Sequence, residues 1–221
     1  MRKVIVAAFV SLDGVMQGPG GPQEDTDGGF RFGGWVAPFF DEAVGEGVGE
    51  GMQEPFALLL GRRTYDIFAA HWPHVPEDHP DRALADLFNG LSKHVATHRP
   101  ESLEWIGSES LGEDIVAGVR KLKAADGPNL LTQGSTQLVH QLFAADLVDE
   151  LRTLTFPVVL GQGKQLFDGK SAPRAFKLVK STASPSGVVL ATYARAGEIA
   201  VGDFSLEQPT EPQPGRDKVL R

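Results

Sequence analysis

The chain has no cysteine among its 221 residues. This absence excludes a disulfide framework, a thiolate metal site and a thiol nucleophile. Hydrophobic residues make up 41% of the chain, which is enough to bury a core without such cross-links. A chain without cysteine fits the cytoplasm, where we expect the protein, although it is also compatible with export.

Long hydrophobic runs are missing too, and none approaches the roughly 20 residues that a membrane-spanning helix needs. Arg2 and Lys3 are followed by an apolar run over 4–10, and this order of charged and apolar residues is also that of a short signal peptide. The run is rich in β-branched residues, however, and 11–14 has the sequence of a turn rather than of a cleavage site. We therefore interpret 3–10 as a first strand and expect no membrane partner.

Positive charge is scarce, because 21 Lys and Arg face 29 Asp and Glu, which gives a net charge of -8. The average field of such a chain repels nucleic acid, so we expect no nucleic-acid partner. Against this balance the local cations Arg62, Arg63, His98 and Arg99 stand out. They indicate a site for an anionic part of a small-molecule ligand.

Strand and helix patterns alternate through the first two-thirds of the chain. Strands are expected over 3–10, 55–60, 93–97, 104–107 and 129–132. Helices are expected over 62–70 and 82–89, from Leu111 to a stop at 127–128, and over a segment that contains 138–143. The helix at Leu111 is expected because Ser110 and Glu113 have the spacing of a capping box.

The last third of the chain turns to strand patterns over 149–159, 175–182 and 187–195. Strands connected through helices run parallel, whereas strands connected by short turns run antiparallel. The order of elements predicts an α/β fold with a mostly parallel central sheet and antiparallel C-terminal edge strands. The exposed edge of such a sheet favours a homodimer.

Three segments interrupt the regular elements. The glycine-rich loop over 11–34 has the length of a lid or a binding loop. A helix is expected from Trp35 to about Val44 and to fray over 45–51, because four of those seven residues are glycine and each interior glycine costs about 1 kcal/mol relative to alanine. Residues 197–221, with three prolines and many charges, are expected to form a tail beyond a single domain over 1–196.

Three of the expected strand ends carry glycine, hydroxyl or cationic residues that suit phosphate. They are Gly61, Arg62, Arg63 and Thr64; Thr97, His98 and Arg99; and Gln133, Gly134, Ser135 and Thr136. Two of these ends continue into an expected helix, whose N-terminus offers free N–H groups and a partial positive charge. Three such ends in one chain indicate an extended phosphorylated ligand, such as a dinucleotide.

These residues also have plainer interpretations. Arg62 and Arg63 can be solvated cations at the start of a surface helix, but there they oppose the helix dipole unless an anion binds. Ser135 can be an ordinary N-cap, which is compatible with phosphate binding. The segment 97–99 can be a polar loop.

Carboxylates and histidines complete the candidates. Asp13, just past the first strand, either holds a substrate amine or the lid, or belongs to a common Asp-Gly turn. Asp41 and Glu42 either face a pocket or form a solvated helix face. The three histidines of 71–79 lie in a proline-broken segment with irregular spacing, so we expect no metal site.

In their order and spacing these motifs resemble the dihydrofolate reductase-like superfamily. The closer resemblance is to its bacterial branch related to the riboflavin-biosynthesis reductase (RibD C-terminal) domain. The resemblance extends over about residues 2–195, and it implies a three-layer dihydrofolate reductase-like fold. It is carried by segments 4–8, 11–14, 60–65, 93–97, 133–135, 147–151, 157–161 and 163–164.

The resemblance implies an NADPH-dependent reductase that transfers a hydride to a small heterocycle of the pterin or ribosylamino-pyrimidine type. In that arrangement 61–64 meet the cofactor phosphates, 97–99 meet the adenosine ribose and its 2′-phosphate, and 133–136 hold the pyrophosphate. Ala8 and the loop from Asp13 lie beside the nicotinamide. Asp13, Asp41 or an ordered water supplies the proton.

Two other functions fit the same residues. A non-catalytic nucleotide-binding module can sense a cofactor without turnover, and substrate-dependent oxidation of NADPH distinguishes the two. A flavin-binding protein of the split-barrel type is the other, and the alternation of strands and helices over 3–195 argues against it.

This chain departs from the dihydrofolate reductases at the third strand end. They carry a Gly-Gly pair joined by a cis peptide where this chain has Gln133 and Gly134, and we do not assume a cis bond there.

Overall fold

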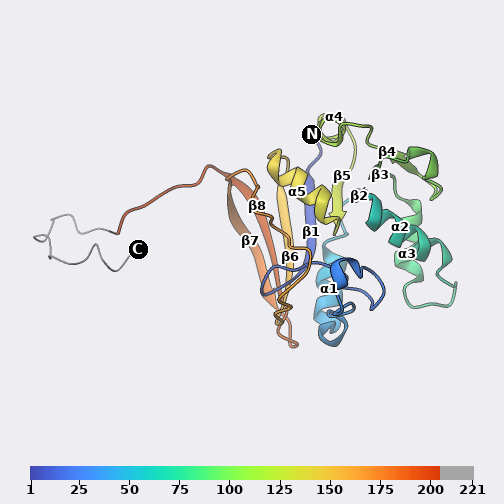
Figure 1. The fold of residues 1–221 in the computed structure, drawn as a ribbon, viewed down its shortest axis with the longest axis horizontal. Coiled ribbons are helices and arrows are strands. Elements are labelled where there is room, and N and C mark those ends of the chain that lie inside the picture. The colour runs from blue at the N-terminus through green and yellow to red at the C-terminus, as the bar shows by residue number, and fades with distance from the viewer. Residues whose placement is uncertain (205–221) are drawn as a thin grey trace, which may run out of the picture.

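The computed structural model describes residues 1–204, and residues 205–221 lie outside the described part. At its centre is an eight-stranded sheet in the order β4-β3-β2-β5-β1-β6-β8-β7 (Figure 1). The strands are β1 Val4–Ser11, β2 Phe56–Gly61, β3 Lys93–Ala96, β4 Ser108–Ser110, β5 Asn129–Gln133, β6 Glu150–Phe156, β7 Ala175–Ala183 and β8 Val189–Gly197.

Parallel pairing joins the strands of the first two-thirds of the chain. β1 lies between β5 and β6, β2 lies between β5 and β3, and β4 pairs with β3. β8 pairs antiparallel with both β6 and β7, and a turn closed by the Gly187 N–H and the Ser184 carbonyl connects β7 to β8. The expected mostly parallel sheet with antiparallel C-terminal edge strands is confirmed.

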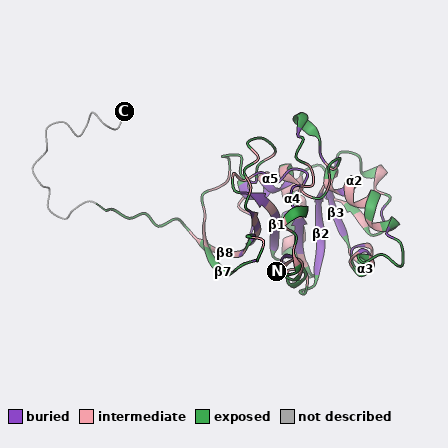
Figure 2. Cartoon of the chain, turned by 90° about the horizontal axis from the view of Figure 1, so that it is seen from below, coloured by how far each residue is buried: buried purple, intermediate pink, exposed green. Residues whose placement is uncertain are grey.

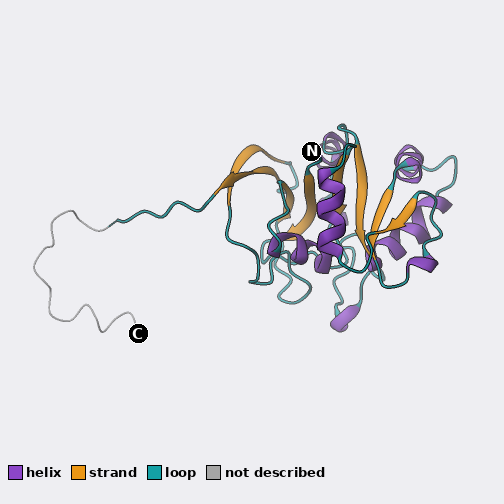
Figure 3. Ribbon diagram, turned by 90° about the horizontal axis from the view of Figure 1, so that it is seen from above, coloured by secondary structure: helices purple, strands orange, loops and turns teal. Residues whose placement is uncertain are grey.

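Helices lie on both faces of the sheet (Figure 3). The helices are α1 Glu42–Glu50, α2 Arg62–His71, α3 Arg82–Gly90, α4 Ile115–Ala124 and α5 Thr136–Ala144, with short 3-10 turns at Asp27–Gly29, Ala37–Phe39, Trp72–His74 and Pro100–Ser102.

The central strands are buried on both faces (Figure 2). Val4 and Val6 of β1 pack in one core with residues of α4 and α5, while Ile5 between them packs in a second core with residues of α2 and α3. Phe9 borders a third core that includes residues of α1, β6 and β8. Alternation of side chains along a strand therefore explains why β1 is apolar along its length.

The strand expected over 104–107 lies instead at Ser108–Ser110, which is β4. Trp105 is buried, and its indole N–H donates to Asn89 Oδ1 at 2.8 Å while its backbone N–H donates to the Tyr65 hydroxyl at 2.9 Å. These bonds hold Trp105 in the core, and the chain turns there before β4 pairs with β3. A buried aromatic side chain thus displaces the strand toward the C-terminus.

The next helix, α4, begins at Ile115 and not at Leu111 as expected. The backbone N–H of Leu111 donates to the Val95 carbonyl at 3.0 Å, so the chain still pairs with β3 at that point. The N-cap is therefore Asp114, whose side chain accepts from a backbone N–H of the first turn, rather than Ser110. Pairing with a neighbouring strand outweighs the capping-box spacing.

α1 covers Glu42–Glu50, whereas a helix over 35–44 with a frayed end over 45–51 was the expectation. Its N-cap is Asp41, whose Oδ1 accepts from Val44 N–H at 2.9 Å and whose Oδ2 accepts from Ser186 N–H at 2.9 Å. Ser186 lies in the turn between β7 and β8, so the start of α1 is tied to the antiparallel end of the sheet.

The glycine-rich part of α1 is helical because it packs closely on that same end of the sheet. A Cβ placed on Gly47 would lie 2.1 Å from Leu190 Cδ2 of β8. At the end of the helix, Arg152 of β6 donates to the Gly51 carbonyl, where a cation complements the helix dipole. Tertiary contacts therefore compensate for the low helix propensity of the glycines.

The antiparallel end of the sheet also carries the outer edge and the C-terminal chain. β7 is the last strand, and its Leu178 and Val179 are exposed. The homodimer expected from such an edge stays a prediction. In the expected tail over 197–221, residues 198–204 form no helix or strand, and the remainder lies outside the described part. No helix in the described residues is long and apolar enough to cross a membrane.

The Lys93 side chain of β3 is fully buried, next to the edge strand β4. Lys93 of β3 donates through Nζ to the carbonyls of Asn89, Leu91 and Ile106 at 2.8–2.9 Å. Its ammonium also lies 4.2 Å from the centre of the Trp105 ring. Burial lowers the pKa of Lys93 to about 8.

We predict that Gly49→Ala stabilises the protein by about 0.5–1 kcal/mol, because alanine is the better helix former and a Cβ at Gly49 meets nothing within 4 Å. Gly47→Ala is the matched control, since it gains the same propensity but forces Leu190 to move. Urea unfolding of both variants measures the difference. Equal stabilisation by the two substitutions would contradict the close packing of α1 on β8.

We predict that the contribution of Lys93 to stability rises between pH 8 and 10.5. In that range the unfolded chain holds a proton on the lysine that the folded chain has lost, so the free energy of unfolding increases with pH. The difference in unfolding free energy between wild type and Lys93→Met should grow by on the order of 1–3 kcal/mol. A difference that is flat or falls over this range would contradict the lowered pKa.

Candidate functional site

A cleft with a volume of about 1580 Å³ runs along the carboxyl ends of the parallel strands. Its lining includes all of the expected cofactor-binding residues: Ala8, Gly61, Arg62, Arg63, Thr64, Thr97, His98, Arg99, Gln133, Gly134, Ser135 and Thr136. Open α/β sheets bind ligands at this edge. The structure therefore brings the three predicted strand ends together in one place.

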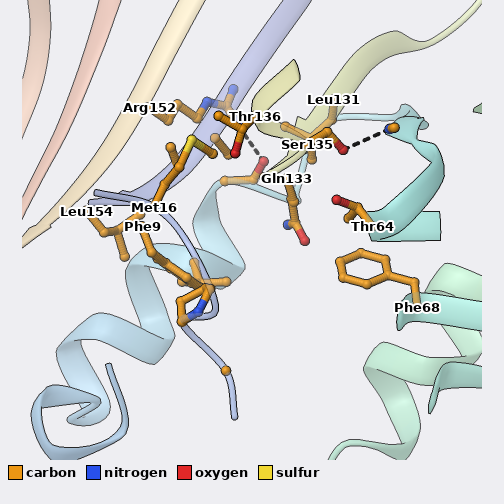
Figure 4. Close-up of a pocket in the computed structure, with 18 of the residues that line it drawn as sticks. Phe9, Met16, Thr64, Phe68, Leu131, Gln133, Ser135, Thr136, Arg152 and Leu154 are labelled. Atoms are coloured by element: carbon orange, nitrogen blue, oxygen red, sulfur yellow. Dashed lines mark hydrogen bonds between the residues drawn. The ribbon is translucent and has the colours of Figure 1, made fainter. Parts of the chain in front are cut away.

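Two of these strand ends are joined by a hydrogen bond across the cleft floor. Gly61 N–H at the end of β2 donates to Ser135 Oγ at 2.8 Å (Figure 4). A Cβ on Gly61 would lie 3.1 Å from the Ser135 Cβ, so a glycine permits this close approach. Ser135 has the left-handed backbone φ of 66°, a conformation that costs a non-glycine residue about 1–3 kcal/mol. Ser135 stands at the N-cap position of α5, as the plainer interpretation expects, but its side chain makes no cap bond to that helix.

The helices that follow these strand ends begin at the cleft without a side-chain cap. Neither Gly61 before α2 nor Ser135 before α5 accepts a bond from its own helix through a side chain. Asp41 and Asp114, by contrast, cap α1 and α4 in this way. The first N–H groups of α2 and α5 thus stay available on the cleft side, together with the positive ends of both helix dipoles. This arrangement favours an anion between them.

Arg62 connects the first strand end to the second. Its NH1 donates to Ser102 Oγ at 2.6 Å, to the Arg99 carbonyl at 3.3 Å and to Thr97 Oγ1 at 3.4 Å, while its Nε donates to Asp66. The guanidinium therefore holds the loop after β3 in place. Thr97 Oγ1 also accepts from Arg99 N–H at 3.0 Å, which tightens the same turn.

His98 and Arg99 are exposed at the mouth of the cleft. The contacts that fix Arg99 are made by its backbone, and its side chain extends from a turn that Arg62 and Thr97 hold. Two side chains that can carry positive charge thus stand at the rim, on a rigid support. Such a pair suits a phosphate at the outer end of a ligand.

Arg63 points toward the loop after β1, which we call the lid (residues 12–34). Its NH1 is 2.6 Å from Asp27 Oδ2 and its NH2 is 3.1 Å from Asp25 Oδ1. Lys164 Nζ reaches the same two carboxylates, at 2.6 Å from Asp25 Oδ2 and 2.8 Å from Asp27 Oδ2. The hydrogen bonds from Lys164 and then Arg63 hold the pKa of Asp27 below its ordinary value. All four side chains line the cleft, and we call them the lid cluster.

The cleft continues past the strand ends between α1 and α2, where its walls are largely apolar. Phe9, Met16 and Leu154 form one side of this part, and Thr64 and Phe68 of α2 form the other (Figure 4). The Phe68 ring stacks on Phe88 of α3, with centres 5.8 Å apart and planes 15° apart. A supported aromatic ring on one wall suits a flat second ligand.

Two residues of the cleft, Phe68 and Glu46, are not among the site residues expected from the sequence. Phe68 follows Thr64 by four positions on an expected helix, so the helical period places both on one face. That signal was present in the sequence. Glu46 of α1 is exposed and lines the cleft, but its place follows from where α1 begins, which depends on contacts with a distant turn.

The two carboxylates expected to act in proton transfer do not line the cleft. Asp13 accepts from Ser11 Oγ at 2.5 Å and from Gly161 N–H at 2.7 Å, which lowers the pKa of Asp13, with the Ser11 bond as the main cause. Asp41 caps α1, and the bond from Val44 N–H lowers the pKa of Asp41. Both carboxylates are occupied by structural bonds, and their role in proton transfer stays a prediction.

The histidines of the proline-broken segment lie at the end of α2 and beyond it. His71 packs on Trp72 with ring centres 4.8 Å apart, and His79 Nδ1 lies 3.7 Å from an Asp81 carboxylate oxygen. No group of three or more His, Cys, Asp or Glu side chains within residues 1–204 is arranged to hold a metal ion.

At the third strand end, the peptide bond between Gln133 and Gly134 is trans.

A family model for the RibD C-terminal domain matches residues 2–190. The chain belongs to this family. A curated relative, the uncharacterized protein YyaP of Bacillus subtilis, is 26% identical over 196 residues, which covers 87% of this chain and 94% of YyaP.

Solved structures share the fold. A deaminase/5-amino-6-(5-phosphoribosylamino)uracil reductase of Thermotoga maritima aligns with a TM-score of 0.57 and 19% identity over 88% of this chain and 57% of that one. Dihydrofolate reductase of Enterococcus faecalis, complexed with NADP(H), aligns with a TM-score of 0.52 and 13% identity over 87% of this chain and 96% of that one. The fold is thus dihydrofolate reductase-like, as expected.

We predict that Ser135→Ala lowers the free energy of unfolding by about 1–2 kcal/mol, because the Gly61 N–H loses its acceptor. Ser135→Gly loses the same acceptor but relieves the left-handed backbone strain, so its loss should be smaller. Urea unfolding of the two variants tests this order. A loss for glycine as large as that for alanine would show that Ser135 is not strained.

Proposed function

We propose that this member of the RibD C-terminal domain family is an NADPH-dependent reductase that transfers a hydride to a small heterocycle, acting in the cytoplasm. The single observation that carries the proposal is the pair of uncapped helix N-termini, α2 and α5, that open onto one cleft. These two helix starts lie between the rim residues His98 and Arg99 and the apolar part of the cleft. This sequence of charged, polar and apolar surfaces matches a dinucleotide with an aromatic ring at its inner end.

The residues present fit such a cofactor. A Cβ on Gly134 would meet only Thr64 Oγ1 within 4 Å, at 3.8 Å, so the space between the two helix starts is open. Backbone N–H groups of 62–64 and 135–137 would hold the pyrophosphate there. His98 and Arg99 would bind the 2′-phosphate that distinguishes NADPH from NADH.

NADPH, when bound, would supply the hydride. The chain itself positions and shields the reacting groups. Ala8 and Phe9 of β1 and Met16 of the lid form an apolar surface that would exclude water at the inner end of the cleft. Phe68 would support the ring of the heterocycle from the opposite wall.

Reduction of a C=N or C=O bond also needs a proton. Two exposed carboxylates of α1, Glu46 and Glu50, line the cleft. Glu50 is paired with Lys180, so Glu46 is the better candidate for contact with the substrate. We assign to it the binding of ring N–H groups or the delivery of the proton through water. The Thermotoga relative, named as a phosphoribosylamino-uracil reductase, supports the ribosylamino-pyrimidine type of substrate, and the dihydrofolate reductase supports the pterin type.

We predict that the protein binds NADPH more tightly than NADH, and that Arg99→Gln weakens NADPH binding about tenfold while leaving NADH binding unchanged. Arg120→Gln is the matched control, because Arg120 is an exposed arginine of α4 that does not line the cleft. Calorimetric titrations of the three proteins with both nucleotides measure this. Equal affinities for NADPH and NADH, or an equal effect of both substitutions, would contradict the 2′-phosphate site.

A further inference from the structure

The lid cluster places two cations on one carboxylate oxygen. Arg63 NH1 and Lys164 Nζ lie 2.6 Å and 2.8 Å from the same atom, Asp27 Oδ2. Arg63 belongs to the first turn of α2, and Lys164 comes from the loop after β6. Two converging cations at a helix start form the kind of surface that binds a phosphate oxygen. In this structure the oxygen they hold belongs to the lid.

The lid is built to present that carboxylate. The buried Gln17 side chain donates through Nε2 to the backbone carbonyls of Asp25 and Asp27, at 3.1 Å and 3.0 Å, and accepts from Lys164 N–H at 3.0 Å. Trp35 Nε1 in turn donates to the Gln17 carbonyl at 2.8 Å. The segment that carries both aspartates is thus fixed through Gln17, facing the cations.

The two aspartates differ in how firmly they are held. Asp25 is buried, and its Oδ1 accepts from Gln17 and from Asp27 N–H in addition to Arg63. The Asp27 side chain is half-exposed, at 51%, and its only side-chain bonds within residues 1–204 are those to Arg63 and Lys164. Asp27 is therefore the carboxylate that another anion can replace, while Asp25 stays as part of the lid.

We propose that Arg63 and Lys164 form the inner part of the pyrophosphate site, and that the Asp27 carboxylate occupies this site until the cofactor displaces it. The inference rests on the proposed function, and it adds Lys164 to the cofactor-binding residues. The lid is then a competitor for the cofactor rather than only a cover over it. Release of Asp27 leaves the lid attached to both cations through Asp25.

Charge balance gives the direction of the effect. Arg63 and Lys164 carry two positive charges, and Asp25 and Asp27 carry two negative charges, so the cluster is balanced with the lid in place. Asp27→Asn keeps the size of the side chain but leaves one positive charge unbalanced at the site. An entering phosphate then meets a free cation and does not have to break an ion pair.

The test is the dissociation constant of NADPH, measured by calorimetry at low salt for the full chain and its variants. Asp27→Asn should bind NADPH about fivefold more tightly than wild type, and it should bind inorganic pyrophosphate more tightly as well. Asp81→Asn is the matched control, since it removes an exposed carboxylate at the cleft that does not touch Arg63 or Lys164. The gain should vanish in the double variants with Arg63→Met or Lys164→Met.

The outcomes separate this inference from the proposed function. If wild type binds NADPH and Asp27→Asn binds it equally or more weakly, the lid does not compete, and only the inference is wrong. An equal gain for Asp81→Asn also overturns it, because the effect is then one of the general field. If neither wild type nor Asp27→Asn binds NADPH, the proposed function is wrong and the inference with it. Binding by Asp27→Asn alone supports both.

Discussion

The whole site depends on the meeting of two helix N-termini at one edge of a parallel sheet. β2 and β5 are neighbours, and each continues directly into a helix, so the starts of α2 and α5 face one another. The Gly61 N–H to Ser135 Oγ bond fixes their distance, and it uses a serine in a strained backbone conformation to do so. Because that hydroxyl serves the neighbouring strand and not its own helix, the N–H groups of α5 remain free for a ligand.

Several cations lie near these two helix starts although the chain as a whole is acidic. A chain with a net charge of -8 keeps cations at the cleft, and most of them already have partners. Arg62 is used to hold the loop after β3, and Arg63 is paired with lid aspartates. The exposed Arg99 is fixed only through its backbone. The three arginines, similar in sequence terms, thus have different surroundings, and we propose different tasks for them: positioning for Arg62, exchange for Arg63 and ligand binding for Arg99.

Local patterns in the sequence predicted the sheet and the three phosphate-suited strand ends, because strand period, helix period and turn residues are set over a few positions. What escaped prediction depends on contacts between distant segments. The partner of Ser135 is 74 residues away, and the residue that fixes the start of α1 is 145 residues from Asp41. The glycines of α1 predicted a frayed helix because glycine has a low helix propensity. The contact of Gly47 with Leu190, which lies in a distant strand, cannot be predicted from the helix sequence alone. The pairing of Arg63 with the lid was hidden for the same reason.

The most direct test of the central claim, that the uncapped starts of α2 and α5 bind the phosphates of a nicotinamide dinucleotide, is an amide NMR titration of the protein with NADPH. We predict that the largest shifts on binding fall on the backbone N–H signals of Arg63, Thr64, Ser135 and Thr136, with smaller shifts at the rim residues His98 and Arg99. The absence of shifts, or shifts confined to other parts of the sheet, would contradict it.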